Sequence, residues 1–195
     1  MRDNIKIHPT AEVSEKSEIG SGTMIWNQVQ VRENTKIGTK CILSKDVYID
    51  TGVSIGNNVK IQNGVSVYNG VTIEDDVFVG PHVAFTNDLY PRATNQNWKI
   101  TKTLIKKGSS IGANATIVCG TTINDYSMIG SGSVINKDVP KYGLVVGNPS
   151  RLIGFVCECG LRLKELSIED NHVKMICDTC NKEFNINKED YSKIK

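Results

Sequence analysis

The sequence has few of the residues that helical proteins use. Only 8 of its 195 residues are Leu, against 22 Ile and 19 Val, and aromatic residues make up 6%. Leucine and alanine favour helices, whereas β-branched residues favour strands. Helical bundles and ordinary α/β folds are therefore disfavoured. The 17 Gly and 18 Asn indicate many tight turns.

Charge excess and long apolar runs are also lacking. The 23 Lys and Arg nearly balance the 21 Asp and Glu, which leaves a net charge of +2. This balance gives no basis for binding nucleic acid or an anionic membrane surface. No run approaches the roughly 20 apolar residues of a membrane-spanning helix. Residues 1–6 lack the apolar segment of a signal peptide. We therefore expect a cytoplasmic protein that does not insert into membranes.

What the sequence has instead is a six-residue repeat. Large apolar residues recur at every sixth position from Ile7 to Phe85 and again, two residues out of phase, from Ile105 to Ile135. Small or β-branched residues stand two positions before them, as at Val59 and Val65, and Gly often follows them. A period of six suits a short strand with two inward side chains and a tight corner.

Three such sides predict a triangular coil of about eighteen residues, in which each strand pairs in parallel with the strand one coil further on. Each coil buries its inward residues against its neighbours, so the repeat is stable only as a stack. The fold class is therefore all-β, a parallel β-helix over residues 1–153. Cys41 and Cys119 occupy regular coil positions, and we interpret both as packed core thiols.

The register breaks at residues 86–104, where polar, non-periodic chain stands in for about one coil. Long patternless loops inside a regular stack are usually functional. We therefore expect a loop that projects from the coil and helps to form a site. The alternative is a tolerated surface insertion, for which Pro91, Arg92 and Trp98 have no evident use.

The hexads stop at Ile153, and residues 154–195 form a tail with two close cysteine pairs. Cys157 and Cys159 are followed, with seventeen residues in between, by Cys177 and Cys180. Two such pairs indicate a zinc-ribbon-like site with four thiolate ligands, although the first pair is C-x-C rather than C-x-x-C. A structural Zn²⁺ would supply the stability that so small a core lacks. In a reducing compartment, two disulfides are the weaker alternative.

Several motifs carry a family resemblance. They are His8-Pro9-Thr10-Ala11, the stretch Gln62 to Tyr68, Phe85-Thr86-Asn87, Tyr90-Pro91-Arg92, Lys106-Lys107-Gly108, the stretch Ile111 to Gly120, and Gly147-Asn148-Pro149-Ser150-Arg151. Over residues 7–153 the chain resembles the hexapeptide acyltransferases. Within them it is most similar to the nucleotide-sugar 3-amino N-acetyltransferases. One departure is that Ile25-Trp26 is followed by Asn27-Gln28, where the family often has aromatic or His residues.

The resemblance implies a left-handed winding, against the usual right-handed crossover rule. It also implies a homotrimer with sites between neighbouring coils, and acetyl-CoA as the co-substrate. The implied acceptor is UDP-2-acetamido-3-amino-2,3-dideoxy-D-glucuronate, a precursor of surface polysaccharides such as O-antigen. Related motifs occur in enzymes acting on dTDP-3-amino-3,6-dideoxyhexoses, so a UDP-linked and a dTDP-linked amino sugar both stay open as the acceptor.

The resemblance also assigns roles to residues. Asn87 matches the Asn at the sugar's reacting end, where an amide orients the amine; the alternative is a corner Asn that closes its own turn. His82 is a candidate general base because histidine is the side chain best suited to proton transfer near neutral pH. It can equally line the site or lie on the surface, since relatives lack a protein base and the amine's proton can pass to the departing sulfur. Acetyl transfer to an amine needs no protein nucleophile.

Substrate and co-substrate contacts follow in the same way. Arg92 suits a sugar carboxylate or pyrophosphate, and Arg32 the nucleotide end. Asn63 and Tyr68, in the mid-coil motif Gln62 to Tyr68, are further candidates for substrate binding. The basic residues Lys106, Lys107 and Arg151 would meet the phosphates of coenzyme A, and backbone groups of Gly112, Ala113 and Ser131 its pantetheine arm.

Two other classes compete. A γ-type carbonic anhydrase needs three His ligands, but His8, His82 and His172 are spread over the start, middle and tail of the chain. A non-catalytic β-helix scaffold is consistent with the repeats, yet it has no need of the polar loop at residues 86–104.

Overall fold

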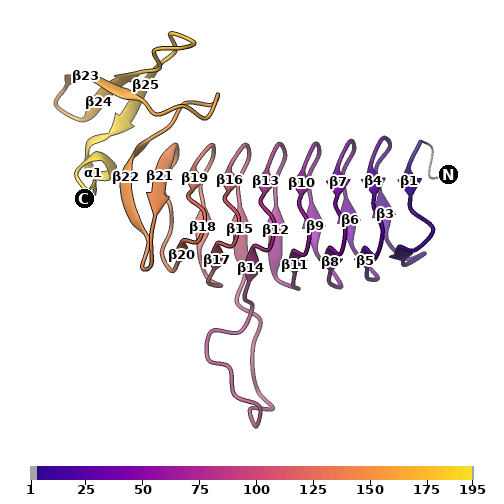
Figure 1. The fold of residues 1–195 in the computed structure, drawn as a ribbon. Helices are drawn as coiled ribbons and strands as arrows, with labels where there is room; N and C mark the ends of the chain where they lie inside the picture. Colours follow the sequence, from indigo (N-terminus) through magenta and orange to yellow (C-terminus); the bar gives the residue numbers. More distant parts are fainter. Residues whose placement is uncertain (1–3, 195) are drawn as a thin grey trace.

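Two-residue strands separated by four-residue corners build most of the coil between residues 6 and 135 (Figure 1). The structure is a computed structural model that describes residues 4–194. The coil has three parallel sheets, named here A, B and C. The strands of sheet A are β1 (Lys6–Ile7), β4 (Met24–Ile25), β7 (Ile42–Leu43), β10 (Lys60–Ile61), β13 (Phe78–Val79), β16 (Ser110–Ile111), β19 (Met128–Ile129) and β21 (Gly143–Val146), with β22 (Arg151–Phe155) antiparallel at its end.

The other two sheets are built in the same way, with one strand from each successive coil. The strands of sheet B are β2 (Glu12–Val13), β5 (Gln30–Val31), β8 (Tyr48–Ile49), β11 (Ser66–Val67), β14 (Ala84–Phe85), β17 (Thr116–Ile117) and β20 (Val134–Ile135). The strands of sheet C are β3 (Glu18–Ile19), β6 (Lys36–Ile37), β9 (Ser54–Ile55), β12 (Val71–Ile73), β15 (Thr103–Ile105) and β18 (Thr122–Ile123).

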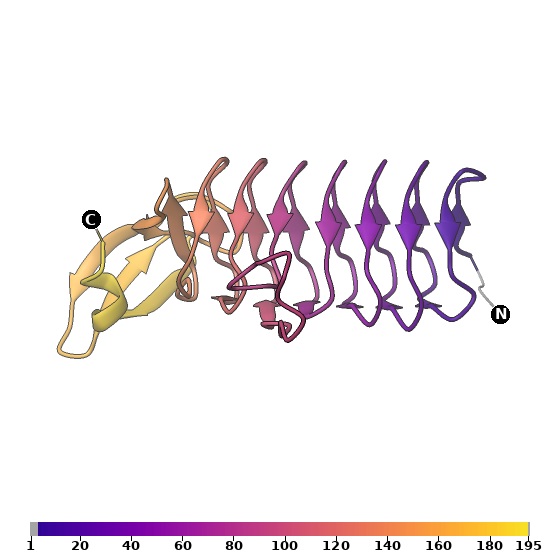
Figure 2. The same ribbon diagram turned by 90° about the horizontal axis from the view of Figure 1, so that it is seen from below.

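The strand register confirms the triangular coil. Ile7 pairs with Ile25 and Ile25 with Leu43, so that neighbouring strands of one sheet are 18 residues apart. Seen from below, the coils form a straight stack (Figure 2). The all-β parallel solenoid predicted from the hexads is therefore confirmed, and its left-handed winding stays a prediction from the resemblance.

The inward hexad residues form one continuous core. Ile61, Ile105, Ile111 and Ile123 are fully buried, and the smaller residues two positions earlier, such as Val59, are buried with them. Cys41 and Cys119 lie in this core, and burial raises the pKa of the Cys41 thiol. Ile7 is 38% exposed because it belongs to the first coil, which has no preceding coil to cover it.

The loop extends one coil rather than replacing one, which corrects the sequence-based reading. Phe78 pairs with Ser110, 32 positions further on instead of 18, so this coil has 14 additional residues. Fourteen is two more than two hexads, which explains why the repeat resumes two residues out of phase. Residues 86–102 leave the stack between β14 and β15 and project well away from it (Figure 1).

The tail lies at the C-terminal end of the coil (Figures 1 and 2). It contains a three-stranded antiparallel sheet of β23 (Lys164–Ile168), β24 (His172–Ile176) and β25 (Glu183–Asn187), followed by α1 (Lys188–Tyr191). Its buried residues, among them Phe155, Val173 and Phe184, join the core of the coil without a break. Among the described residues, no helix has the length and apolar character needed to cross a bilayer.

Candidate active site

The three edges of the coil divide the predicted site residues into groups. We name each edge by the two sheets that its corners connect: the A–B, B–C and C–A edges. Residues in one column of an edge recur every 18 positions and lie about 4.8 Å apart along the stack. Corner residues often have the left-handed backbone conformation, which Asn, Asp and Gly tolerate best, as at Asn58, Asp76 and Asn114.

The B–C edge holds Arg32, Tyr68, Asn87 and Arg92. Arg32 follows β5, Tyr68 follows β11, and the loop with Asn87 and Arg92 follows β14, so these residues rise along one edge of the stack. The structure thus places all predicted acceptor-binding residues except Asn63 along one edge, and of these only Asn87 and Arg92 line the same hollow.

Asn87 is held in one orientation at the base of the loop. Its Nδ2 donates to the backbone carbonyl of Asn69 in the preceding coil at 3.3 Å, and its own carbonyl accepts from Thr101 N at 2.9 Å, where the loop returns. A carbonyl only accepts hydrogen bonds, so the nitrogen of the amide must face Asn69. The amide oxygen Oδ1 therefore faces away from Asn69 and can accept a hydrogen bond from a ligand. Asn87 itself is half-buried.

The loop encloses a shallow hollow of about 510 Å³ next to Asn87. Arg92 and Trp98 line it together with Asn87, Asp88 and Asn95. Arg92 is exposed, and its Nη1 donates to the carbonyl of Pro91 at 2.8 Å. Most of its five N–H groups therefore stay available to an anionic ligand.

Tyr48 and Asp50 belong to the same edge, although sequence reasoning did not select them. Tyr48 Oη donates to Asp50 Oδ1 at 3.0 Å and lies 3.5 Å from Arg32 Nη1, and the Tyr48 ring meets the Tyr68 ring at 6.1 Å. Partial burial and the Asp50 carboxylate raise the pKa of Tyr48. The hydrogen bond from Arg32 lowers the pKa of Glu33. The sequence does contain a signal for this column, because Arg32, Asp50 and Tyr68 are spaced 18 residues apart.

The A–B edge holds His82 with Asn63, Ala113 and Ser131. The N–H of His82 donates to the Asn63 carbonyl at 2.9 Å, and its ring lies against Gly64. His82 has a left-handed backbone conformation and an exposed side chain. Sheet B separates it from Asn87, so one chain does not bring these two candidates together.

The backbone of this edge leaves hydrogen-bond donors free. Within residues 4–194, the N–H groups of Ala113 and Ser131 have no acceptor, whereas Gly112 N donates to Ile129 O at 2.8 Å. Gly112 also has a packing role, because a Cβ there would lie 2.5 Å from Ser131 N. Ala113 and Ser131 are therefore the better donors to a ligand.

The predicted phosphate-binding residues lie elsewhere. Lys106 and Lys107 follow β15 on the C–A edge, and Lys107 Nζ lies 3.7 Å from Asp76. Arg151 begins β22 at the end of the stack and is exposed. Sheet A separates the two lysines from Ala113, so an extended ligand is needed to reach both.

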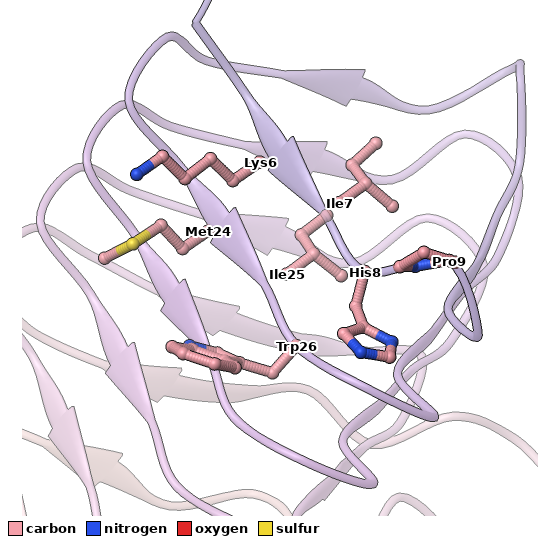
Figure 3. Close-up of a pocket in the computed structure, with 7 residues that line it drawn as sticks. All are labelled: Lys6, Ile7, His8, Pro9, Met24, Ile25 and Trp26. Carbon is pink, nitrogen blue, oxygen red and sulfur yellow. The ribbon is translucent and has the colours of Figure 1, made fainter.

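A second hollow, of about 330 Å³, lies on the outer face of sheet A in the first coils (Figure 3). His8 and Trp26 lie near one another in it, with the apolar parts of Lys6 and Met24 alongside. None of the predicted site residues lines this hollow, and it is several coils away from the loop.

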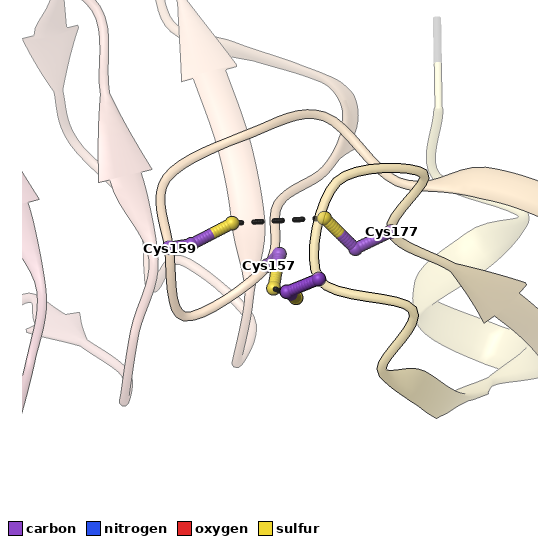
Figure 4. Close-up of side chains that lie close together, drawn as sticks. Cys157, Cys159 and Cys177 are labelled. Carbon is purple, nitrogen blue, oxygen red and sulfur yellow. Dashed lines mark hydrogen bonds between the residues drawn. The ribbon is translucent and has the colours of Figure 1, made fainter.

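The four tail cysteines converge on one point. Their Sγ atoms all lie within 4.8 Å of one another, the closest pairs being Cys157–Cys180 at 3.4 Å and Cys159–Cys177 at 3.6 Å (Figure 4). Backbone N–H groups of Cys180 and Thr179 lower the pKa of Cys177 to about 6. In the part of the chain that the structure describes, this is the one group of three or more His, Cys, Asp or Glu residues suited to a metal. His8, His82 and His172 form no such group within the described residues of one chain.

Comparison with known proteins supports the repeat. The family model described as bacterial transferase hexapeptide (six repeats) matches residues 52–87 and 102–137, and the gap between the two matches is the projecting loop. A second model, the hexapeptide repeat of succinyl-transferase, matches residues 33–69.

One curated relative is the dTDP-3-amino-3,6-dideoxy-α-D-galactopyranose 3-N-acetyltransferase of Aneurinibacillus thermoaerophilus. It is 52% identical over 63 residues, which are 32% of this chain and 33% of the relative. The match thus spans about a third of that relative's length.

Two solved structures share the coil. A hexapeptide-repeat acetyltransferase of Vibrio cholerae O1 biovar eltor, complexed with acetyl coenzyme A, has 28% identity and a TM-score of 0.56, over 64% of this chain and 72% of that one. The GDP-perosamine N-acetyltransferase of Caulobacter crescentus, at 20% identity and a TM-score of 0.53 over 77% and 56% of the two chains, shows the shared fold. Through its repeats and its coil, the chain is similar to the bacterial hexapeptide-repeat transferases.

Proposed function

We propose that the protein is an acetyl-CoA-dependent N-acetyltransferase that acetylates the 3-amino group of a nucleotide-linked amino sugar. The observation that carries this proposal is Asn87, whose amide is fixed at the base of a polar loop in a hexapeptide coil. The Vibrio cholerae structure with acetyl coenzyme A supports the co-substrate, and the Aneurinibacillus relative supports the class of acceptor.

The reaction is a direct attack of the neutral amine on the thioester carbonyl. The new C–N bond forms first and gives a tetrahedral intermediate, whose C–S bond then breaks to release the thiolate of coenzyme A, and the amine's proton passes to that sulfur. Asn87 Oδ1 accepts a hydrogen bond from an N–H of the amine, which aims the nitrogen lone pair at the carbonyl without removing the proton from the amine. The oxyanion is stabilised by backbone N–H donors, for which Ala113 and Ser131 are the candidates.

The acceptor lies along the B–C edge in this proposal. Its amino sugar sits at the Asn87 end, Arg92 pairs with a carboxylate or the pyrophosphate, and the nucleotide extends toward Tyr68 and Arg32. Arg32 lies three coils from the Asn87 coil, which is about 14 Å and matches an extended nucleotide sugar. Acetyl-CoA follows Gly112, Ala113 and Ser131, with its phosphates toward Lys106, Lys107 and Arg151.

The nucleotide sugar has two candidates. The motifs Phe85-Thr86-Asn87 and Tyr90-Pro91-Arg92 favour UDP-2-acetamido-3-amino-2,3-dideoxy-D-glucuronate, whose carboxylate suits Arg92. The Aneurinibacillus relative favours a dTDP-3-amino-3,6-dideoxyhexose. The product of the first reaction would serve surface polysaccharide synthesis.

A homotrimer completes the site. Asn87 and Ala113 lie on different edges of one chain, so the amine and the thioester meet only where the B–C edge of one subunit faces the A–B edge of the next. In such a groove, His82 of the second edge can approach the amine held by the first.

A thiol-release assay with acetyl-CoA tests the function across UDP- and dTDP-linked 3-amino sugars. We expect turnover with one nucleotide class and its loss when the 3-amino group is replaced by hydroxyl. No turnover with any of these sugars would reject the assignment. If acetyl-CoA also fails to protect the protein against thermal unfolding, the non-catalytic scaffold is the remaining reading.

A further inference from the structure

The tail's cysteine cluster has the geometry of a metal site rather than of disulfides. Four thiolates around Zn²⁺ at about 2.3 Å place neighbouring sulfurs about 3.8 Å apart. The closest pairs here are 3.4 and 3.6 Å apart, and all four Sγ atoms lie within 4.8 Å. A disulfide bond needs about 2.05 Å. The observed spacings therefore fit four ligands of one ion.

The elements around the cluster hold the ligands in two hairpin-like turns. Cys157 and Cys159 follow β22, and Cys177 and Cys180 lie between β24 and β25. Gly160 N donates to Cys157 O at 2.8 Å, and Asn181 N donates to Cys177 O at the same distance. A salt bridge of 2.7 Å between Glu158 and Lys182 joins the two turns. Each turn thus presents two sulfurs to the same point (Figure 4).

The four thiolate ligands indicate which metal ion the site binds. Soft sulfur donors in a closed set of four favour Zn²⁺ over Mg²⁺ or Ca²⁺, which prefer oxygen. Four protein ligands also leave no open position, so the ion cannot bind substrate. Such a site is structural.

The tail that this site would hold together covers the end of the coil. The Tyr142 ring, in the last coil, stacks on Tyr126 at 5.7 Å and meets the edge of Phe184 in β25 at 4.9 Å. Phe155, fully buried, stacks on Tyr191 of α1 at 6.3 Å. Stacked repeats need a cap because their last coil otherwise exposes its core.

We infer that Cys157, Cys159, Cys177 and Cys180 bind one structural Zn²⁺, and that this ion fixes the tail as the cap of the coil's C-terminal end. The tail's own core is small, with few buried residues such as Val173 and Ile186. The free energy of metal binding then stabilises the folded tail, as a larger hydrophobic core would otherwise do.

Metal analysis of the full chain, purified in reductant without chelator, tests the site. We expect one zinc per chain, and less than about a tenth of that in Cys177→Ser. Cys119→Ser, which removes a buried thiol of the coil, should keep one zinc. Two outcomes would overturn the site: metal-free protein with six titratable thiols, or metal-free protein with two thiols and two disulfides.

Hydrogen exchange tests the cap separately. Chelation of the zinc should speed amide exchange in residues 142–187 and leave residues 25–80 unchanged. Tyr142→Leu, which leaves the cysteines in place, should keep one zinc while the contact between tail and coil exchanges faster. If zinc is present but its removal leaves exchange in the last coil unchanged, the capping role is wrong and the metal site stands. Both readouts are independent of acetyl transfer.

Discussion

At the scale of single residues, the position of a hydrogen bond decides what Asn87 can do. Because Nδ2 is used by the Asn69 carbonyl, Oδ1 is the atom left for the substrate. Asn87→Ala removes an acceptor worth about 1–3 kcal/mol, so we expect kcat/KM to fall about ten- to a hundredfold in the thiol-release assay. Asn97→Ala, on the exposed part of the same loop, should stay near wild type. Full activity in Asn87→Ala would remove its role.

His82 presents the opposite case, since the proposed reaction does not need its imidazole. Within one chain it lies across sheet B from Asn87, and although the proposed groove between subunits brings it toward the amine, attack by a neutral amine needs no protein base. We expect His82→Asn, which tolerates the left-handed conformation, to lose less than about tenfold in kcat, with an unchanged pH profile. A general base would instead account for about 10²–10⁴ and one limb of that profile. Such a loss would restore His82 as the base.

At the scale of elements, the sequence period predicted the coil because packing fixes it. Ile61 and Val79 had to lie inward one coil apart, and the register pairs them. The prediction that the loop replaces a coil was wrong because its polar residues show no six-residue period from which the length of that coil could be counted. The sequence motifs also did not predict which residues meet at an edge. Tyr48 has an ordinary strand position, and only the stacking of the coils places it beside Arg32 and Tyr68.

The loop's attachment depends on Gly70. Its backbone has φ of 97°, and a Cβ there would collide with the side chain of Ile100 at the loop's return. We expect Gly70→Ala to cost about 1–3 kcal/mol through overpacking, in addition to backbone strain, and to raise KM for the sugar. Thermal unfolding and kinetics measure the two effects. Gly132→Ala has φ of 70° and nothing within 4 Å, so it should show the strain alone, about 1–2 kcal/mol. Equal losses in both variants would contradict the role of Ile100.

At the scale of the whole molecule, the proposed trimer depends on the outer face of sheet B. The B–C edge of one subunit can face the A–B edge of the next only across this face, because sheet B lies between the two edges. We therefore expect Ala84→Glu, at an exposed position of β14, to place a charge in the interface and shift sedimentation toward the monomer. Thr72→Glu, at an exposed position of sheet C, should stay trimeric. A trimeric Ala84→Glu would place the interface on another face.

The division of the site between two edges gives the sharpest test of assembly. Asn87 on the B–C edge and Ala113 on the A–B edge lie on opposite sides of sheet B in one chain. If each site combines edges of two subunits, Asn87→Ala and Ala113→Trp damage different halves of it. Random mixed trimers of these two impaired variants would then contain about a quarter of intact sites, because a site is intact only when its B–C edge comes from an Ala113→Trp subunit and its A–B edge from an Asn87→Ala subunit. Coexpression should therefore recover measurable thiol release, whereas mixing after separate purification recovers it only if subunits exchange. A site built within one chain leaves every mixed trimer inactive, since each subunit then keeps its own defect.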